Sequence, residues 1–184
     1  HNHRMRFLAG VVISSPKAYK IKVLTDINFL NFFQGGARFM LYSIKILLEL
    51  RSYPAIISYL DSKTSQLTTI QDDFVIVYCI KQPYVTSDFY IAPQAQLDDG
   101  YLWLLLLRRK NVNRFKLLKI MLGFHTGHHL DIEGVEMIRT KYFKFEPLCQ
   151  RSYLTVDGEL IDLCTVEAEI VPKAIDVFCK TQNK

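Results

Sequence analysis

The chain has 184 residues, of which 49% are hydrophobic and 22% are charged. These values fit one globular domain with a sizeable core and argue against a disordered chain. The net charge of +5 favours mild attraction to anionic surfaces. Nucleic-acid binding is disfavoured, because it requires a basic stripe interleaved with aromatic residues. Residues 108–110 form the one tight basic cluster, which is typical of a solvated strand end.

The cysteines and the apolar stretches exclude several other classes. The four cysteines are widely spaced and form no C-x-x-C pair, so neither a zinc site nor a redox pair is indicated. This spacing suits buried thiols in a reducing compartment. No secretory signal is visible at the start. The most apolar stretch, residues 39–50, contains Lys45 and Glu49 and is too short to span a bilayer.

The first quarter of the chain predicts one strand and one long helix. The strand is expected over residues 8–14, before a break at Ser14-Ser15-Pro16. After Gly35-Gly36, a helical pattern runs from Ala37 to about Arg51. Its polar residues fall on one narrow stripe, so most of this helix should be covered by protein or ligand. The polar residues are Arg38, Lys45 and Glu49.

Residues 54–107 predict short strands separated by polar segments. Pro54 ends the helical region, and residues 61–73 are polar enough to form a loop. Continuous apolar runs at 74–80 and 101–107 suit strands that are buried on both faces. Two shorter strands are expected at residues 56–60 and 88–91.

The last part of the chain predicts one capped helix followed by strands. The helix runs from Arg114 to Phe124 with Asn113 as its N-cap, and one face should contain Leu117, Leu118, Met121 and Leu122. Asp157-Gly158 separates two strand patterns, which is a strong hairpin signal. The strands are expected at residues 141–145, 153–156, 159–162, 166–171 and 174–179.

Many short strands with few helices define the expected fold class. We predict a mainly β (α+β) fold, an antiparallel β-sandwich with about two amphipathic or apolar helices. The chain shows no internal repeat and no low-complexity tract. Residues 1–184 are therefore expected to form a single domain.

Acidic turns are the segments most able to support chemistry. The turns at 92–100 and 154–159 contain Asp98-Asp99-Gly100 and Asp157-Gly158-Glu159. Such oxygens could hold Mg²⁺ or orient a nucleotide, although an Asp-Gly pair is common in plain turns. The histidines at 125–129 are a weak metal candidate, because Gly127 interrupts the helix that their spacing requires. The sequence contains no nucleophile elbow, phosphate loop or dinucleotide fingerprint.

Taken in chain order, several segments between residues 37 and 180 resemble the C-terminal domain of the diacylglycerol kinase and sphingosine kinase superfamily. The segments are Asp73-Phe74-Val75-Ile76-Val77-Tyr78, Ser87-Asp88, Ala92-Pro93, Ala95, Asp98-Asp99-Gly100, Phe115-Lys116-Leu117-Leu118, Leu122-Gly123, Gly127, His129, Phe143-Lys144-Phe145-Glu146-Pro147 and Leu154-Thr155-Val156-Asp157-Gly158-Glu159. Residues 37–39, 50–53 and 58–60 favour the sphingosine kinase branch of this lipid kinase family. Bacterial lipid kinases, diacylglycerol kinases and ceramide kinases remain alternatives.

The resemblance implies an enzyme that transfers the γ-phosphoryl group of ATP to the hydroxyl of a sphingoid lipid, converting sphingosine to sphingosine 1-phosphate. ATP and Mg²⁺ would bind in a cleft between this domain and an N-terminal kinase domain. The family's Gly-Gly-Asp-Gly-type loop and its catalytic aspartate belong to that other domain and do not occur in this sequence. The chain alone should therefore be inactive. The resemblance also implies a cytoplasmic protein that associates peripherally with a membrane surface and binds no nucleic acid.

The resemblance assigns nucleotide contacts to four residues. Asp157, Gly158 and Glu159 match the family's Asp-Gly-Glu motif, which contacts the nucleotide. Glu159 is a secondary catalytic candidate, because the glutamate at this place is assigned as a base in the bacterial relatives. Arg38 matches an arginine that reaches the ATP phosphates, which fits the bidentate chemistry of a guanidinium group. A solvated helix residue explains Arg38 equally well.

A structural Mg²⁺ site and a lipid pocket follow from the same resemblance. The metal would bind the carboxylate of Asp99 and the carbonyl oxygens of Gln96 and Tyr101. The acyl-chain pocket would be lined by Phe39, Ile120, Met121, Phe124 and His129. Core packing explains these five residues as readily. A non-catalytic β module that binds lipid or a membrane surface remains the alternative function, because the helices are apolar and the chain is basic.

Overall fold

The computed structural model describes residues 11–14, 47–86, 89–149, 153–156 and 159–171. The fold is mainly antiparallel β with few helices, which confirms the predicted fold class. The strands are β1 (Val11–Ser14), β2 (Tyr53–Leu60), β3 (Leu67–Ile80), β4 (Tyr84–Thr86), β5 (Phe89–Tyr90), β6 (Leu102–Arg108), β7 (Val135–Thr140), β8 (Tyr142–Pro147), β9 (Tyr153–Val156), β10 (Glu159–Ile161) and β11 (Val166–Glu169). The helices are α4 (Arg114–Gly123) and the short 3-10 turns η2 (Arg109–Asn111) and η3 (His128–Asp131).

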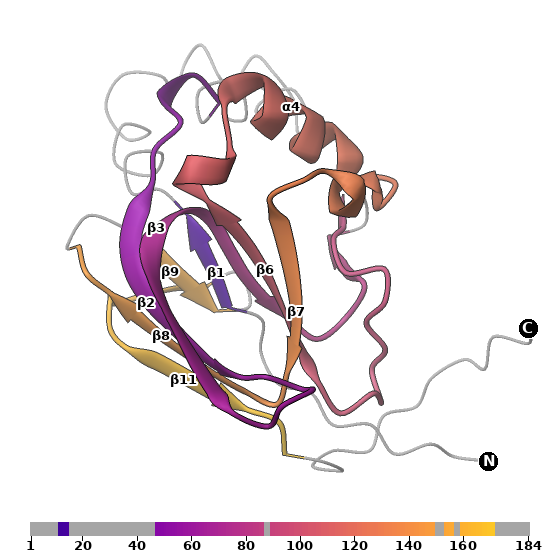
Figure 1. The fold of residues 1–184 in the computed structure, drawn as a ribbon, viewed down its shortest axis with the longest axis vertical. Helices are drawn as coiled ribbons and strands as arrows, with labels where there is room; N and C mark the ends of the chain where they lie inside the picture. Colours follow the sequence, from indigo (N-terminus) through magenta and orange to yellow (C-terminus); the bar gives the residue numbers. More distant parts are fainter. Residues whose placement is uncertain (1–10, 15–46, 87–88, 150–152, 157–158, 172–184) are drawn as a thin grey trace, which may run out of the picture.

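Strand β3 organises the large sheet. The sheet order is β10-β9-β1-β3-β2-β8-β11, and β6 also pairs with β3 and leads on to β7. The first half of β3, residues 67–74, pairs with β2, whereas the second half pairs with β6 and with β1. The register shifts between Phe74 and Ile76, where the strand changes partners. The sheet therefore curves around β3 (Figure 1), while β4 and β5 form a separate small ribbon.

The curved sheet encloses a first apolar cluster. It includes Ile57 of β2, Leu104 of β6 and Phe143 of β8, each with 0% of its surface exposed. A second cluster lies on the other face of β6, where Leu105 and Leu107 pack with Leu117 and Ile120 of α4. Residues 102–107 are thus buried on both faces, as the continuous apolar run predicts.

The prediction that residues 61–73 form a loop is wrong from residue 67 onward. The turn occupies only the first part, where Oδ1 of Asp61 accepts hydrogen bonds from the backbone N–H groups of Lys63 and Thr64 at 2.7 and 3.1 Å. Residues 67–73 continue into β3 and pair with β2. Leu67, Thr69, Gln71 and Asp73 are exposed along this half of the strand. Polar residues are tolerated there because one face of an antiparallel strand can remain in water.

Helix α4 begins where the sequence predicts, but its faces differ from the prediction. Oδ1 of Asn113 accepts a hydrogen bond from the backbone N–H of Lys116 at 2.9 Å, which confirms the N-cap. Leu117 is buried as expected, whereas Leu118 and Leu122 are 41% and 65% exposed. The buried residues of the helix are Leu117, Ile120 and Gly123. The predicted shared face was wrong because the helix has apolar residues of its own on several sides, so the sequence does not determine which side faces the core.

Several other boundaries differ from the sequence prediction. Pro54 lies inside β2 rather than between elements. Strand β7 was not predicted, and β4 was also missed. The predicted helix at 37–51 is described only from residue 47, where it ends at Glu49. Its earlier part and the predicted strand at 174–179 lie outside the described residues.

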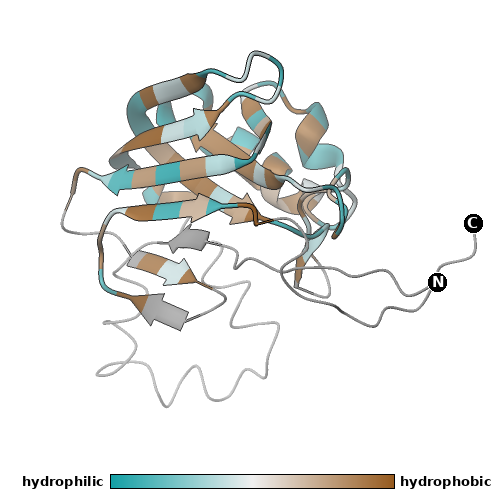
Figure 2. Cartoon of the chain, turned by 90° about the horizontal axis from the view of Figure 1, so that it is seen from below, coloured by the Kyte–Doolittle hydropathy of each residue, from teal (hydrophilic) through white to brown (hydrophobic). Residues whose placement is uncertain are grey.

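Hydropathy follows the strands in alternating bands (Figure 2), the pattern expected where one face is buried and the other is solvated. Within the described ranges, every helix is too short or too polar to cross a bilayer. Cys79 is buried, as predicted for a structural thiol, but Cys164 is exposed. The prediction of buried thiols is therefore wrong for Cys164.

Candidate functional site

The predicted nucleotide-binding hairpin forms as expected. Strand β10 pairs antiparallel with β9, with Glu159 opposite Val156. Strand β9 in turn pairs with β1. Asp157, Gly158 and the side chain of Glu159 lie outside the described part of the chain, as do Arg38 and Phe39. Their assigned roles therefore stay predictions.

The predicted metal-binding loop at 92–101 is held together by one carboxylate. Oδ1 of Asp99 accepts hydrogen bonds from Nζ of Lys81 and, at 2.9 Å, from the backbone N–H of Tyr101. Oδ2 accepts from the backbone N–H of Gln96 at 3.1 Å and from Nε1 of Trp103 at 2.8 Å. Nζ of Lys81 also donates to the carbonyl oxygen of Gln96 at 2.9 Å. The side chains of Lys81 and Asp99 are 5% and 16% exposed.

These contacts determine the charge state of the loop. Burial raises the pKa of Asp99, but hydrogen bonds from Lys81, Trp103, Tyr101 and Gln96 outweigh it and hold the pKa below its ordinary value. The carboxylate is therefore ionised at neutral pH. It is compensated by the ammonium group of Lys81, which the sequence analysis did not select.

A magnesium ion does not fit this arrangement. A carboxylate offers about four lone-pair sites, and four N–H donors already bind Asp99. The carbonyl oxygen of Gln96, a second predicted ligand, accepts from the same ammonium group. Mg²⁺ requires oxygen lone pairs at about 2.0–2.1 Å, and these two residues present theirs to nitrogen donors.

Four of the predicted lipid-pocket residues come together beneath α4. Ile120, Phe124 and His129 are 1%, 6% and 0% exposed, and Met121 is half-buried against the same cluster. The rings of Phe124 and His129 meet edge to face at 4.8 Å between centroids. Packing in the second apolar cluster accounts for these positions. Contact with a lipid chain stays a prediction.

Buried His129 connects α4 to the start of the same loop. Its Nε2 lies 2.9 Å from the carbonyl oxygen of Ile91, and its Nδ1 lies 3.3 Å from that of Gly123. Burial lowers the pKa of His129, and the two carbonyl oxygens oppose that effect without overcoming it. A β-carbon on Gly123 would stand 2.6 Å from the backbone nitrogen of His129. Glycine therefore permits the close approach between α4 and η3.

The remaining predicted features have structural roles. Arg108 and Lys110 form ion pairs at the end of β6, at 2.8 Å to Glu136 and 2.7 Å to Asp72, as expected of a strand end. The described residues contain no group of three or more metal-ligating side chains. In the histidine segment at 125–129, the ring nitrogens of His129 contact two backbone carbonyl oxygens.

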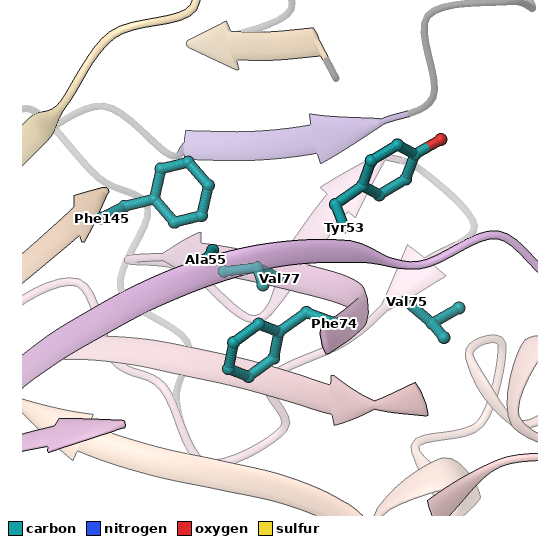
Figure 3. A pocket seen from close by; sticks show the side chains of 6 residues that line it. All are labelled: Tyr53, Ala55, Phe74, Val75, Val77 and Phe145. Carbon is teal, nitrogen blue, oxygen red and sulfur yellow. The ribbon is translucent and has the colours of Figure 1, made fainter. Parts of the chain in front are cut away.

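An apolar hollow of about 10 Å³ lies within the curved sheet. Figure 3 shows the six side chains that line it, and they come from β2, β3 and β8. The lining residues are Tyr53, Ala55, Phe74, Val75, Val77 and Phe145. This volume admits about one water molecule, so the hollow cannot hold a lipid chain.

Comparison with known proteins shows which sequences this domain is similar to. The chain is 28% identical to sphingosine kinase 1 of Caenorhabditis elegans over 121 residues, which cover 65% of this chain and 26% of that protein. It is 31% identical to sphingosine kinase 2 of Homo sapiens over 106 residues, covering 56% of this chain and 16% of the human protein. The chain thus spans about a quarter or less of these relatives.

A solved structure supports the fold independently. The crystal structure of a diacylglycerol kinase from Bacillus anthracis str. Sterne superposes with a TM-score of 0.54 at 18% identity, covering 91% of this chain and 50% of that one. Residues 17–179 match the family described as the YegS C-terminal NAD kinase beta sandwich-like domain. The chain belongs to this family, the C-terminal β-sandwich-like domain of the lipid kinases.

Proposed function

We propose that this chain forms one wall of a catalytic cleft and acts with an N-terminal kinase domain to transfer the γ-phosphoryl group of ATP to the hydroxyl of a sphingoid base. The observation that carries the proposal is the 31% identity to a sphingosine kinase over 106 residues of a domain with the lipid kinase fold. Mg²⁺ would arrive with the ATP substrate. The proposal includes a cytoplasmic protein that acts at a membrane surface containing its lipid.

We assign two regions of the chain to the two substrates, ATP and the lipid. The tip of the β9–β10 hairpin, with Asp157, Gly158 and Glu159, would contact the nucleotide, and Arg38 would neutralise phosphate charge. Positioning and charge neutralisation supply most of the rate of phosphoryl transfer. The acyl chain would contact the second apolar cluster through Met121, which is half-exposed and adjoins buried Ile120 and Phe124.

A chimera tests this proposal. In it, this chain replaces the matching segment of the Caenorhabditis elegans sphingosine kinase, and transfer of labelled phosphate from ATP to sphingosine, ceramide and diacylglycerol is measured. We expect phosphorylation of sphingosine above the other two lipids. We also expect no turnover by the 184-residue chain alone, because that sequence lacks the Gly-Gly-Asp-Gly-type loop and the catalytic aspartate.

Matched variants locate the nucleotide contact. Glu159→Gln and Asp157→Asn should lower turnover in the chimera at least tenfold, while Asp162→Asn, an exposed carboxylate just beyond β10, should leave it unchanged. A folded chimera without transfer to any of the three lipids would refute the proposal. Preference for ceramide or diacylglycerol would refute its substrate assignment.

The outer face of α4 supports membrane contact as a second candidate function. Phe115, Leu118 and Leu122 follow one another along this face and are 81%, 41% and 65% exposed. Arg114 and Lys119 are exposed beside them. An apolar stripe flanked by basic residues is suited to the interface of an anionic membrane.

Vesicle flotation tests this second function. We expect the chain to float with phosphatidylserine-containing vesicles and to lose this binding when Phe115→Ser and Leu122→Ser are combined. The matched control is Leu67→Ser, because Leu67 is 62% exposed on the β2–β3 hairpin. Equal loss of binding in the control, or no binding by the unaltered chain, would contradict membrane contact through α4.

A further inference from the structure

Lys81 occupies the position that the sequence predicts for a metal ion. The predicted ligands were oxygens of Gln96, Asp99 and Tyr101. In the structure, one ammonium group donates both to the carbonyl oxygen of Gln96 and to Oδ1 of Asp99. It reaches this loop from the end of β3, 18 positions before Asp99.

We propose that the Lys81 ammonium group is a built-in cation that organises the 92–101 loop in place of a divalent metal, so that the fold of this domain needs no metal. The proposal rests only on the contacts around Asp99 and is independent of the proposed kinase function. It implies that Mg²⁺ would matter to the assembled enzyme only as the partner of its nucleotide.

The number of donors around Asp99 is the first argument. Its two oxygens accept from Lys81, from Nε1 of Trp103 and from the backbone N–H groups of Gln96 and Tyr101. Four donors match the roughly four lone-pair sites of a carboxylate. A divalent ion would have to displace at least one of these donors before it could bind.

Charge and burial are the second argument. Lys81 is buried at 5% exposure, and a buried ammonium group is stable only with an anionic or hydrogen-bonding partner. A divalent ion on the same oxygens would stand beside this ammonium group in a site of low dielectric, where like charges repel strongly. The site therefore holds one cation, and that cation is covalently part of the chain.

The 92–101 loop lies against the second apolar cluster, so the ammonium group of Lys81 affects more than the loop itself. The loop begins at Ile91 and Ala92, which pack in the second apolar cluster, and the carbonyl of Ile91 contacts His129. It leads into β6, where Trp103 lies on the outer face and donates to Asp99. Lys81 thus fixes the segment that covers the apolar cluster next to α4.

Trp103 makes the proposal measurable without an activity assay. It is the only tryptophan in the 184 residues, and its indole nitrogen binds Asp99 directly, so its fluorescence reports on this site. We expect the emission spectrum and the melting temperature of the unaltered chain to be the same in EDTA, Mg²⁺, Ca²⁺ and Mn²⁺. A saturable change with any of these ions that EDTA reverses would overturn the proposal.

A Lys81 variant provides a second test of the proposal. Lys81→Met keeps most of the length of the side chain but removes its charge. It should lower the melting temperature by roughly 6–12 °C and shift the Trp103 emission, because the largely buried carboxylate of Asp99 loses its cationic partner. Lys63→Met, which alters an exposed lysine of the β2–β3 turn, should change neither property. A Lys81→Met chain as stable as the unaltered one would overturn the proposal. If that variant does not fold, the metal titration of the unaltered chain decides the question alone.

Discussion

The two faces of strand β6 bury different kinds of side chain. Toward the inside of the curved sheet, Leu102, Leu104 and Leu106 are each 0% exposed and belong to the first apolar cluster. Toward α4, Trp103 and Leu105 belong to the second apolar cluster. Buried Lys81 and His129 adjoin this cluster through Asp99 and Ile91. The inner face thus contributes to the fold mainly through apolar packing. The outer face places ionisable groups among apolar ones, and four of the residues with an expected lipid role, Ile120, Met121, Phe124 and His129, lie there.

The inner face should be the most sensitive to truncation. Leu104→Ala removes a fully buried side chain from the first apolar cluster, and we expect the free energy of unfolding to fall by about 3 kcal/mol because a cavity remains. Urea unfolding followed by Trp103 fluorescence measures this change. A loss below about 1 kcal/mol would mean that the inner face relaxes around the cavity, and the contrast between the faces would weaken.

The outer face depends on α4 being well formed. Asn113→Ala removes the side chain that accepts from the backbone N–H of Lys116, and we expect the free energy of unfolding to fall by about 1 kcal/mol. Asn113→Asp keeps an acceptor at the N-cap and should retain the stability. Equal losses in both variants would show that the cap does not act through this hydrogen bond.

Acid should weaken the outer face specifically. Because burial lowers the pKa of His129, the unfolded chain binds this proton more readily than the folded chain. The contribution of His129 is therefore complete above the ordinary histidine pKa of 6.5 and is lost progressively as the pH falls below it. The difference in unfolding free energy between the unaltered chain and His129→Gln, measured at several pH values, isolates this effect. A difference that does not vary between pH 7.5 and 5 would contradict it.

The solvent face of α4 should affect stability least. Leu122 is 65% exposed, so Leu122→Ser should change the free energy of unfolding by less than about 0.5 kcal/mol. Chemical unfolding of the purified variant measures this value. A loss above about 1 kcal/mol would show that this leucine is packed in solution and is not available to a membrane.

Local sequence signals predicted the elements whose cause is local. The apolar run at 101–107, the Asn113 cap and the Asp157-Gly158 turn each depend on neighbours within a few residues, and the structure contains the corresponding strand, cap and hairpin. The family resemblance supplied the domain type, which the comparison with known proteins confirms.

Long-range contacts explain what the sequence could not predict. A lysine that follows a buried strand is typical of a solvated strand end, and only the approach of a loop 18 residues away buries Lys81. Residues 67–73 are polar because one side of β3 faces water, so no apolar pattern identifies them as a strand. Resemblance could select Met121 and its neighbours in the second apolar cluster as lipid contacts. The sequence could not distinguish that role from ordinary core packing.

The length of β3 has a mechanical consequence for the whole domain. Its 14 residues form hydrogen-bonded ladders first with β2 and then with β6 and β1. The two parts of the curved sheet therefore share one continuous backbone and cannot slide past each other or swing apart without breaking that backbone's own ladder. We therefore expect the two parts of the sheet to move together as one body.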